Sequence, residues 1–203
     1  MTRVRATCFA VVSLLLACGT VTEVPDVWRD QDFGGGPFAN IFVIGVSENP
    51  DTRRLFENRF AEELAKRGGG GGASYESLPD VGHLSESRVR EAVANGKYDG
   101  VLVTHLISRG EESSYVEPRP YAVPRVNPGY YNDYTATWEV IQQPGYTTSN
   151  DVARLETRLY DLRSGKRVWS AKSQTLDPRS LAAGIVSVTA AVAKQLAADG
   201  MIR

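Results

Sequence analysis

Apolar residues follow two different patterns along the chain, and the change of pattern divides it into two halves. In the first half, residues 40–46 and 100–108 are continuous apolar runs, which is typical of strands buried on both faces. Between these runs, apolar residues recur at intervals of four and predict an amphipathic helix over residues 51–67. Asp51 is the expected N-cap of this helix, and Gly68 is the residue that ends it.

Two weaker elements complete the first half of the chain. Residues 73–78 predict a weak strand, and a short helix opened by Ser85 or a neighbour ends at Asn95-Gly96. The resulting order β-α-β-α-β favours parallel strands joined by right-handed crossovers. The glycine run at residues 68–72 follows a helix and contains no Lys, so we interpret it as a flexible connection rather than a phosphate-binding loop.

The second half shows the alternation of half-buried strands. Residues 134–141 are rich in strand formers, and residues 151–162 alternate between apolar and polar side chains. Residues 167–175 form the next predicted strand, after a turn at Ser164-Gly165. A final helix with apolar residues at helical spacing begins after Asp177-Pro178.

These elements predict the fold class α/β, as a single domain over residues 40–203 of order β-α-β-α-β-β-β-α, with a mixed sheet flanked by helices. A Tyr- and Pro-rich insertion at residues 109–133 interrupts this order and is too long for an ordinary connection, so it is either functional or disordered. Exposed Tyr rings suit contacts with a protein partner or with the faces of sugars. The alternative, that these rings cover the domain's own sheet, stays open. The candidate partner-binding residues are Tyr115, Tyr121, Tyr130, Tyr131 and Tyr134.

The beginning of the chain resembles a bacterial lipoprotein signal peptide. Residues 1–17 combine Arg3 and Arg5 with an apolar run that has the length of a secretory segment and is too short to span a bilayer. The run ends in Leu-Leu-Ala before Cys18, as in a lipobox, whose Cys is lipidated and becomes the mature N-terminus. A plain signal peptide with a chance Cys is the alternative. We therefore expect attachment to the membrane through a lipid on Cys18, and Gly19 favours the outer membrane, facing the periplasm.

Charge and cysteine content exclude several classes of function. The chain has 23 Lys and Arg residues against 24 Asp and Glu, which gives no support to a nucleic-acid partner. Its two Cys and two His form no cluster with metal-ligand spacing, so we predict neither a metal nor a cofactor. Residues 18–39 include Pro25 and a glycine triplet at 34–36, with few periodic apolar positions, and predict a flexible tether between the lipid and the domain.

Three residues are candidates for catalytic groups. His105 lies in a predicted strand, but no Ser in a nucleophile pattern accompanies it. Glu111 and Glu112 are adjacent, so on an extended segment their side chains point apart, unlike the paired carboxylates of a glycosidase. We expect a non-catalytic protein, with a hydrolase of peptidoglycan or exported polysaccharide as the alternative.

Four blocks between residue 40 and the end of the chain resemble an uncharacterised family of Gram-negative lipoproteins, a domain of unknown function. They are Arg-Arg-Leu-Phe-Glu at 53–57, Tyr-Asp-Gly-Val-Leu-Val at 98–103, Glu-Thr-Arg-Leu-Tyr-Asp at 156–161 and Val-Trp-Ser-Ala at 168–171. The order of elements also resembles the amino-terminal domain of the translocation protein TolB and the lipoproteins of curli secretion and Pel polysaccharide export. The resemblance implies a binding or assembly module of the cell envelope, which binds an envelope protein or glycan or forms a homo-oligomer, and it brings no catalytic residues.

Overall fold

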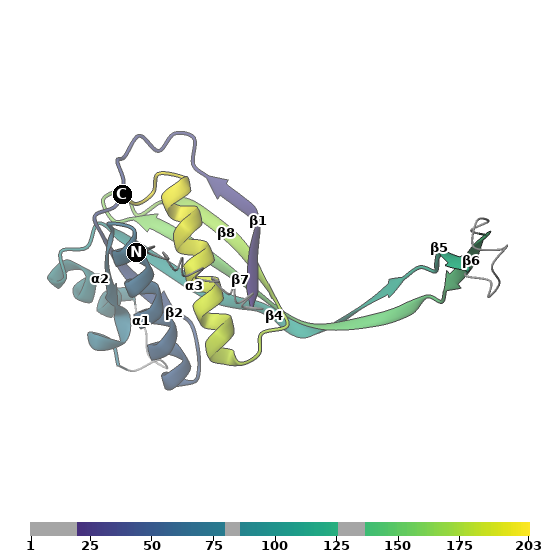
Figure 1. Ribbon diagram of the computed structural model, residues 1–203. Helices are drawn as coiled ribbons and strands as arrows, with labels where there is room; N and C mark the ends of the chain where they lie inside the picture. The colour runs from purple at the N-terminus through teal and green to yellow at the C-terminus, as the bar shows by residue number, and fades with distance from the viewer. Residues whose placement is uncertain (1–19, 80–85, 126–136) are drawn as a thin grey trace, which may run out of the picture.

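A six-stranded mixed sheet forms the centre of the molecule, in a computed structural model that describes residues 20–79, 86–125 and 137–203 (Figure 1). The sheet order is β1-β8-β7-β4-β2-β3. Strands β2, β3 and β4 run parallel, whereas β7, β8 and β1 join the sheet as antiparallel strands. The predicted α/β class and mixed sheet are therefore confirmed. In chain order the elements are β1 (Val21–Arg29), β2 (Asn40–Gly45), α1 (Pro50–Lys66), β3 (Gly70–Ala73), the 3-10 turn η1 (Ser74–Glu76), α2 (Glu86–Asn95), β4 (Gly100–Val116), β5 (Arg119–Arg125), β6 (Thr137–Gln143), β7 (Tyr146–Asp161), β8 (Arg167–Leu176) and α3 (Leu181–Ala198).

Helices cover both faces of the parallel half of the sheet, which explains the continuous apolar run of β2. Ile41 and Val43 belong to the larger core, to which α1 and α3 contribute. Phe42 and Ile44 alternate with them and belong to a smaller core that includes Val93 of α2. A strand with helices on both sides has no polar face, so it needs apolar residues at consecutive positions.

The first helix stops before Gly68 as predicted, but its N-cap lies two residues earlier than expected. The side chain of Asn49, not Asp51, is the N-cap, because its Oδ1 accepts hydrogen bonds from the backbone N–H groups of Asp51 (2.9 Å) and Thr52 (3.0 Å). Pro50 then occupies the first turn, where its missing N–H costs no hydrogen bond. Gly68 follows the helix with φ of +82°, a left-handed conformation that favours Gly.

The prediction of a flexible tether over residues 18–39 is wrong for residues 21–29, which form the edge strand β1. This strand pairs antiparallel with β8, from Val21 opposite Leu176 to Arg29 opposite Trp169. The pairing has a register shift between Glu23 and Asp26, next to Pro25, which lacks a backbone donor. β1 also lies along α3, so side chains from both ends of the chain pack together.

The glycine run is part of the sheet rather than a flexible connection, which corrects the prediction for that segment. Residues 70–73 form β3, parallel to the first four residues of β2, whereas the strand expected at 73–78 is the turn η1 beyond Ala73. A Cβ atom at Gly71 would lie 3.0 Å from Ala61 of α1, and at Gly72 it would lie 1.9 Å from the Tyr98 hydroxyl. Because Gly71 and Gly72 have no side chains, α1 and the Tyr98 ring can approach β3 closely.

The last helix, α3, is long and apolar enough to span a bilayer by length and composition. It packs against β1, β8 and α1, and its buried residues include Ile185, Val188 and Leu196, so we describe it as a helix of the domain core. Its N-cap is Ser180 rather than Asp177-Pro178. Immediately after the helix, Asp199 accepts a 2.7 Å hydrogen bond from the indole Nε1 of the buried Trp169.

Candidate functional site

The segment predicted as an insertion contributes to a long two-stranded arm that projects from the domain (Figure 1). β4 and β7 pair from Gly100 opposite Asp161 to Val116 opposite Tyr146, with one register shift between Leu106 and Ser108. This pairing extends beyond the point where β2 and β8 stop pairing with them. β5 and β6 continue the arm as a separate two-stranded sheet (Figure 1). Among residues 20–79, 86–125 and 137–203, no third strand pairs with the outer part of the arm.

The arm is polar along its shaft and carries apolar side chains farther out. Residues 110–114 are exposed, and none of them is a large apolar residue. Tyr115 is 64% exposed and Tyr121 is 48% exposed, so neither covers the sheet of the domain. Tyr121 lies directly opposite Ile141, which is also exposed. Tyr130, Tyr131 and Tyr134 lie outside the described residues, and their role stays a prediction.

A two-stranded ribbon of this kind has few interactions of its own. An isolated hairpin is at best marginally stable in water, and three strands or packing on another element are needed for independent stability. In the arm, Glu112 and Arg154 form an ion pair across the two strands, and Glu111 accepts a hydrogen bond from Ser149. These exposed contacts contribute little, because solvent screens the two charges and ordering two long side chains costs entropy.

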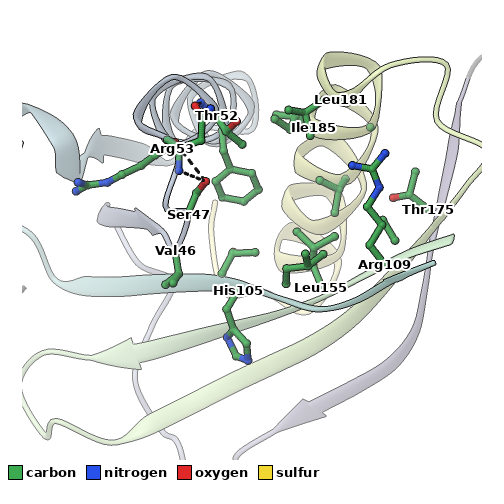
Figure 2. A pocket seen from close by; sticks show the side chains of 18 of the residues that line it. Val46, Ser47, Thr52, Arg53, His105, Arg109, Leu155, Thr175, Leu181 and Ile185 are labelled. Atoms are coloured by element: carbon green, nitrogen blue, oxygen red, sulfur yellow. Dashed lines mark hydrogen bonds between the residues drawn. The ribbon is translucent and has the colours of Figure 1, made fainter. Parts of the chain in front are cut away.

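A second feature is a mainly apolar groove of about 460 Å³. It lies where the parallel pairing of β2 with β4 ends, at Gly45 and Thr104. It lies between the first turns of α1 and α3, on the face of the sheet that these helices cover (Figure 2). Ligands of open α/β sheets often bind outside the carboxyl ends of the strands, at the point where successive connections diverge. The apolar residues that line it include Phe56, Leu106, Leu155, Leu181, Ile185 and Val188.

Two polar features stand at the rim of the groove. The loop before α1 supplies Ser47 and Asn49, which also hydrogen-bond to each other at 3.2 Å (Figure 2). On the α3 side stands Arg109, which follows a register shift in β4 that turns it to the helix-covered face. Within the described part of the chain no hydrogen bond or ion pair holds its guanidinium. The groove therefore has the positive charge of Arg109 at its rim, beside an apolar surface.

Beneath the α1 side of the groove lies a buried ion pair that the sequence did not reveal. Arg53 is 1% exposed and Glu57 is fully buried, and the Arg53 Nε lies 2.9 Å from Glu57 Oε1. Glu57 also accepts hydrogen bonds from the backbone N–H of Gly45 (2.9 Å) and Tyr75 (2.8 Å) and from Ser74 Oγ (2.7 Å). This carboxylate therefore connects α1 to the ends of β2 and β3 and fixes the floor of the site.

The residues weighed as catalytic groups do not meet in one site. The ring of His105 points away from the groove, and its Nε2 lies 3.3 Å from Glu156 Oε2 on the opposite face (Figure 2). Arg158 donates hydrogen bonds to the same carboxylate and lowers the pKa of Glu156. Glu111 and Glu112 stand on the arm, away from His105, and the hydrogen bond from Arg154 lowers the pKa of Glu112. Among the described residues, no three His, Cys, Asp or Glu side chains gather as metal ligands.

The sequence singled out neither the groove nor Arg109. The apolar lining residues come from β4, β7, α1 and α3, where they have the same periodicity as core residues. The register shift between Leu106 and Ser108 is the feature that brings Arg109 onto this face, and strand alternation alone does not predict it.

Comparison with known proteins gives likenesses of structure only. No protein-family model and no curated protein sequence matches the chain. Among solved structures, the PelC dodecamer of Paraburkholderia phytofirmans is 16% identical, with 88% of this chain and 98% of that one covered and a TM-score of 0.44. Lipoprotein GNA1162 of Neisseria meningitidis is 16% identical, with 79% and 99% covered and a TM-score of 0.41. A PDZ domain protein of Parabacteroides distasonis is 12% identical, with 88% and 36% covered and a TM-score of 0.44.

The structural neighbours thus include PelC and a Neisseria lipoprotein, both at low identity, which fits the expected resemblance in part. The expected likenesses to TolB and to the curli lipoprotein stay predictions. At these scores the neighbours assign no activity to this chain.

Proposed function

We propose that this chain is a lipid-anchored module of the cell envelope, without catalytic activity, that binds a protein partner through its arm. The lipobox-like segment that ends at Cys18 supports the anchor and the placement at the outer membrane, on the periplasmic side. The observation that carries the binding role is the projecting arm, whose Tyr115, Tyr121 and Ile141 are exposed.

The physical argument is that the domain gains nothing from this arm. In the part of the chain that the structure describes, the outer strands of the arm add no residue to the two apolar cores. Ordering such a ribbon costs conformational entropy, and its own pairing scarcely offsets that cost. A partner surface that packs on the ribbon or adds a strand to it supplies the missing stabilisation and buries the aromatic residues.

Site-specific photocrosslinking in intact cells tests this proposal. A benzophenone amino acid replaces Tyr121 on the arm, and in the control it replaces Val186 on α3, which has the same exposed fraction of 48%. We expect protein adducts from position 121 and none from position 186. Adducts of twice the chain mass would identify the partner as a second copy, and other masses would identify a different protein.

Two results would overturn the binding role. One is a yield of protein adducts at position 121 no higher than at position 186. The other is an adduct that contains glycan and no second polypeptide, which would move the partner to the class of envelope polysaccharides. Loss of the anchor is scored separately, by the intact mass of the protein extracted from membranes.

A further inference from the structure

The groove lies close to the place where the chain arrives from the predicted lipidation site. Thr20 is held against α3, because its carbonyl oxygen accepts a 3.0 Å hydrogen bond from Ser187 Oγ. Thr22 Oγ1 in turn donates to the Ser187 hydroxyl at 2.8 Å and lies 2.7 Å from Thr175 Oγ1. Thr175 is itself a lining residue of the groove, so the start of β1 and the wall of the groove are directly connected.

This attachment limits how far the anchor can be from the domain. Cys18 precedes Thr20 by two residues, and an extended chain covers at most about 3.5 Å per residue, so the Cα atoms of Cys18 and Thr20 can be at most about 7 Å apart. Thr20 and Thr22 contact α3 and Thr175 on the same face of the sheet as the groove. The described chain therefore starts on the side of the sheet that holds the groove, two residues after Cys18.

The chemistry of the groove fits an acyl chain. Its volume falls within the range of about 300–1,000 Å³ that small-molecule sites occupy. Two of its lining residues are large apolar side chains left in water, Leu106 at 54% and Leu181 at 53% exposure, and an acyl chain would bury both. Arg109 stands at the rim of the groove. It pairs with Ala153 of β7, which in turn pairs with Thr175 of β8. Its guanidinium offers hydrogen-bond donors to the ester carbonyls of a glyceride.

We propose that the groove receives one acyl chain of the lipid carried by Cys18 of the same molecule. The inference rests on the lipid anchor in the proposed function. The lipid attached to Cys18 is favoured over a free membrane lipid, because a short linker raises the effective concentration of an attached group to the millimolar range. Stable membrane attachment needs more than one buried chain, so withdrawing one chain into the groove weakens the hold on the bilayer in a graded way.

Intramolecular photocrosslinking tests the occupancy of the groove. The mature lipidated protein is reconstituted at one copy per lipid nanodisc, with a benzophenone amino acid at Leu181 or, as the control, at Val186. Both positions are on α3, are about half exposed and fall within the tryptic peptide of residues 180–194, but only Leu181 lines the groove. We expect position 181 to join this peptide to the lipidated peptide of residues 18–29, with a yield at least tenfold above position 186.

Each other outcome overturns the inference in a distinguishable way. An adduct with a free phospholipid alone would show that the groove takes membrane lipid instead of the anchor. Equal yields at the two positions, or no adduct at either, would show that no acyl chain occupies the groove. An intact mass without acyl groups on Cys18 would refute both the lipid anchor of the proposed function and this inference. An acylated mass without the adduct would refute this inference alone.

Discussion

Removal of the Glu57 carboxylate is the perturbation with the largest expected effect on stability. In the Glu57→Ala variant, the Arg53 guanidinium stays buried without its counter-charge, although its Nη2 still donates to Ser74 Oγ at 2.7 Å. Its Nη1 already lacks a partner among the described residues, so the loss of Glu57 leaves most of this cation unsatisfied. The backbone N–H groups of Gly45 and Tyr75 lose their acceptor as well.

The magnitude follows from the burial of the pair. Breaking a buried ion pair by removing one partner costs about 3–5 kcal/mol, because an uncompensated charge remains. Natural domains have a total unfolding free energy of about 5–15 kcal/mol, so this one change removes a large share of it. Replacing both residues by apolar ones of similar size, Arg53→Met with Glu57→Leu, removes the stranded charge, and we expect this double variant to be more stable than Glu57→Ala.

Urea unfolding followed by tryptophan fluorescence, to which the buried Trp169 contributes, measures these differences. With a slope of about 2 kcal/mol per molar urea, the loss in Glu57→Ala lowers the midpoint by roughly 2 M. Glu57→Gln, which retains an acceptor oxygen, should fall between the wild-type chain and Glu57→Ala. A midpoint shift in Glu57→Ala smaller than about 0.5 M, or a double variant less stable than the single one, would refute the reasoning from buried charge.

Three further variants have smaller expected effects, each measurable by urea unfolding. Asn49→Ala removes the acceptor that caps α1 and should cost about 1 kcal/mol; no change would mean that water replaces the cap. Gly68→Ala places a side chain at φ of +82° and should cost about 1–2 kcal/mol, in contrast to Gly34→Ala, whose added Cβ would meet no atom within 4 Å. Glu156 has a pKa lowered by Arg158, so its stabilisation is present above the unfolded pKa of about 4.3 and is lost as pH falls below it. Glu156→Gln should therefore lose less stability than the wild-type chain between pH 5 and pH 3, and parallel pH curves would contradict this assignment.

The elements predicted from the sequence are those in which the pattern of apolar side chains reflects their burial. The apolar runs of β2 and β4 and the helical spacing in α1 and α3 come from packing on the two cores, so periodicity reveals them. β1 was missed because its exposed residues and Pro25 hide the contribution of Val24, which packs against the larger core. β3 was missed because glycines have no side chain to show a pattern, although the close approach of Ala61 requires them.

The functional features depend on relations that one sequence does not display. The insertion was recognised by its Tyr and Pro residues, but its shaft is held by backbone pairing between polar strands, which leaves no amphipathic signal. The groove exists only when the first turns of α1 and α3 stand over β4 and β7. Arg109 and Leu181 look like ordinary surface residues in the sequence, and only the tertiary structure shows that both line the same groove.

The pairing of β1 with β8 also determines the order in which the chain can fold. Val21 finds its partner Leu176 only near the other end of the polypeptide, and Phe38 forms a bridge with Ile202, almost the last residue. Contacts of such high sequence separation raise the contact order and slow folding, because a long loop must close before they form. The first strand therefore stays without its partner until β8 and α3 have been synthesised, and an unpaired edge strand can pair with other chains during that time.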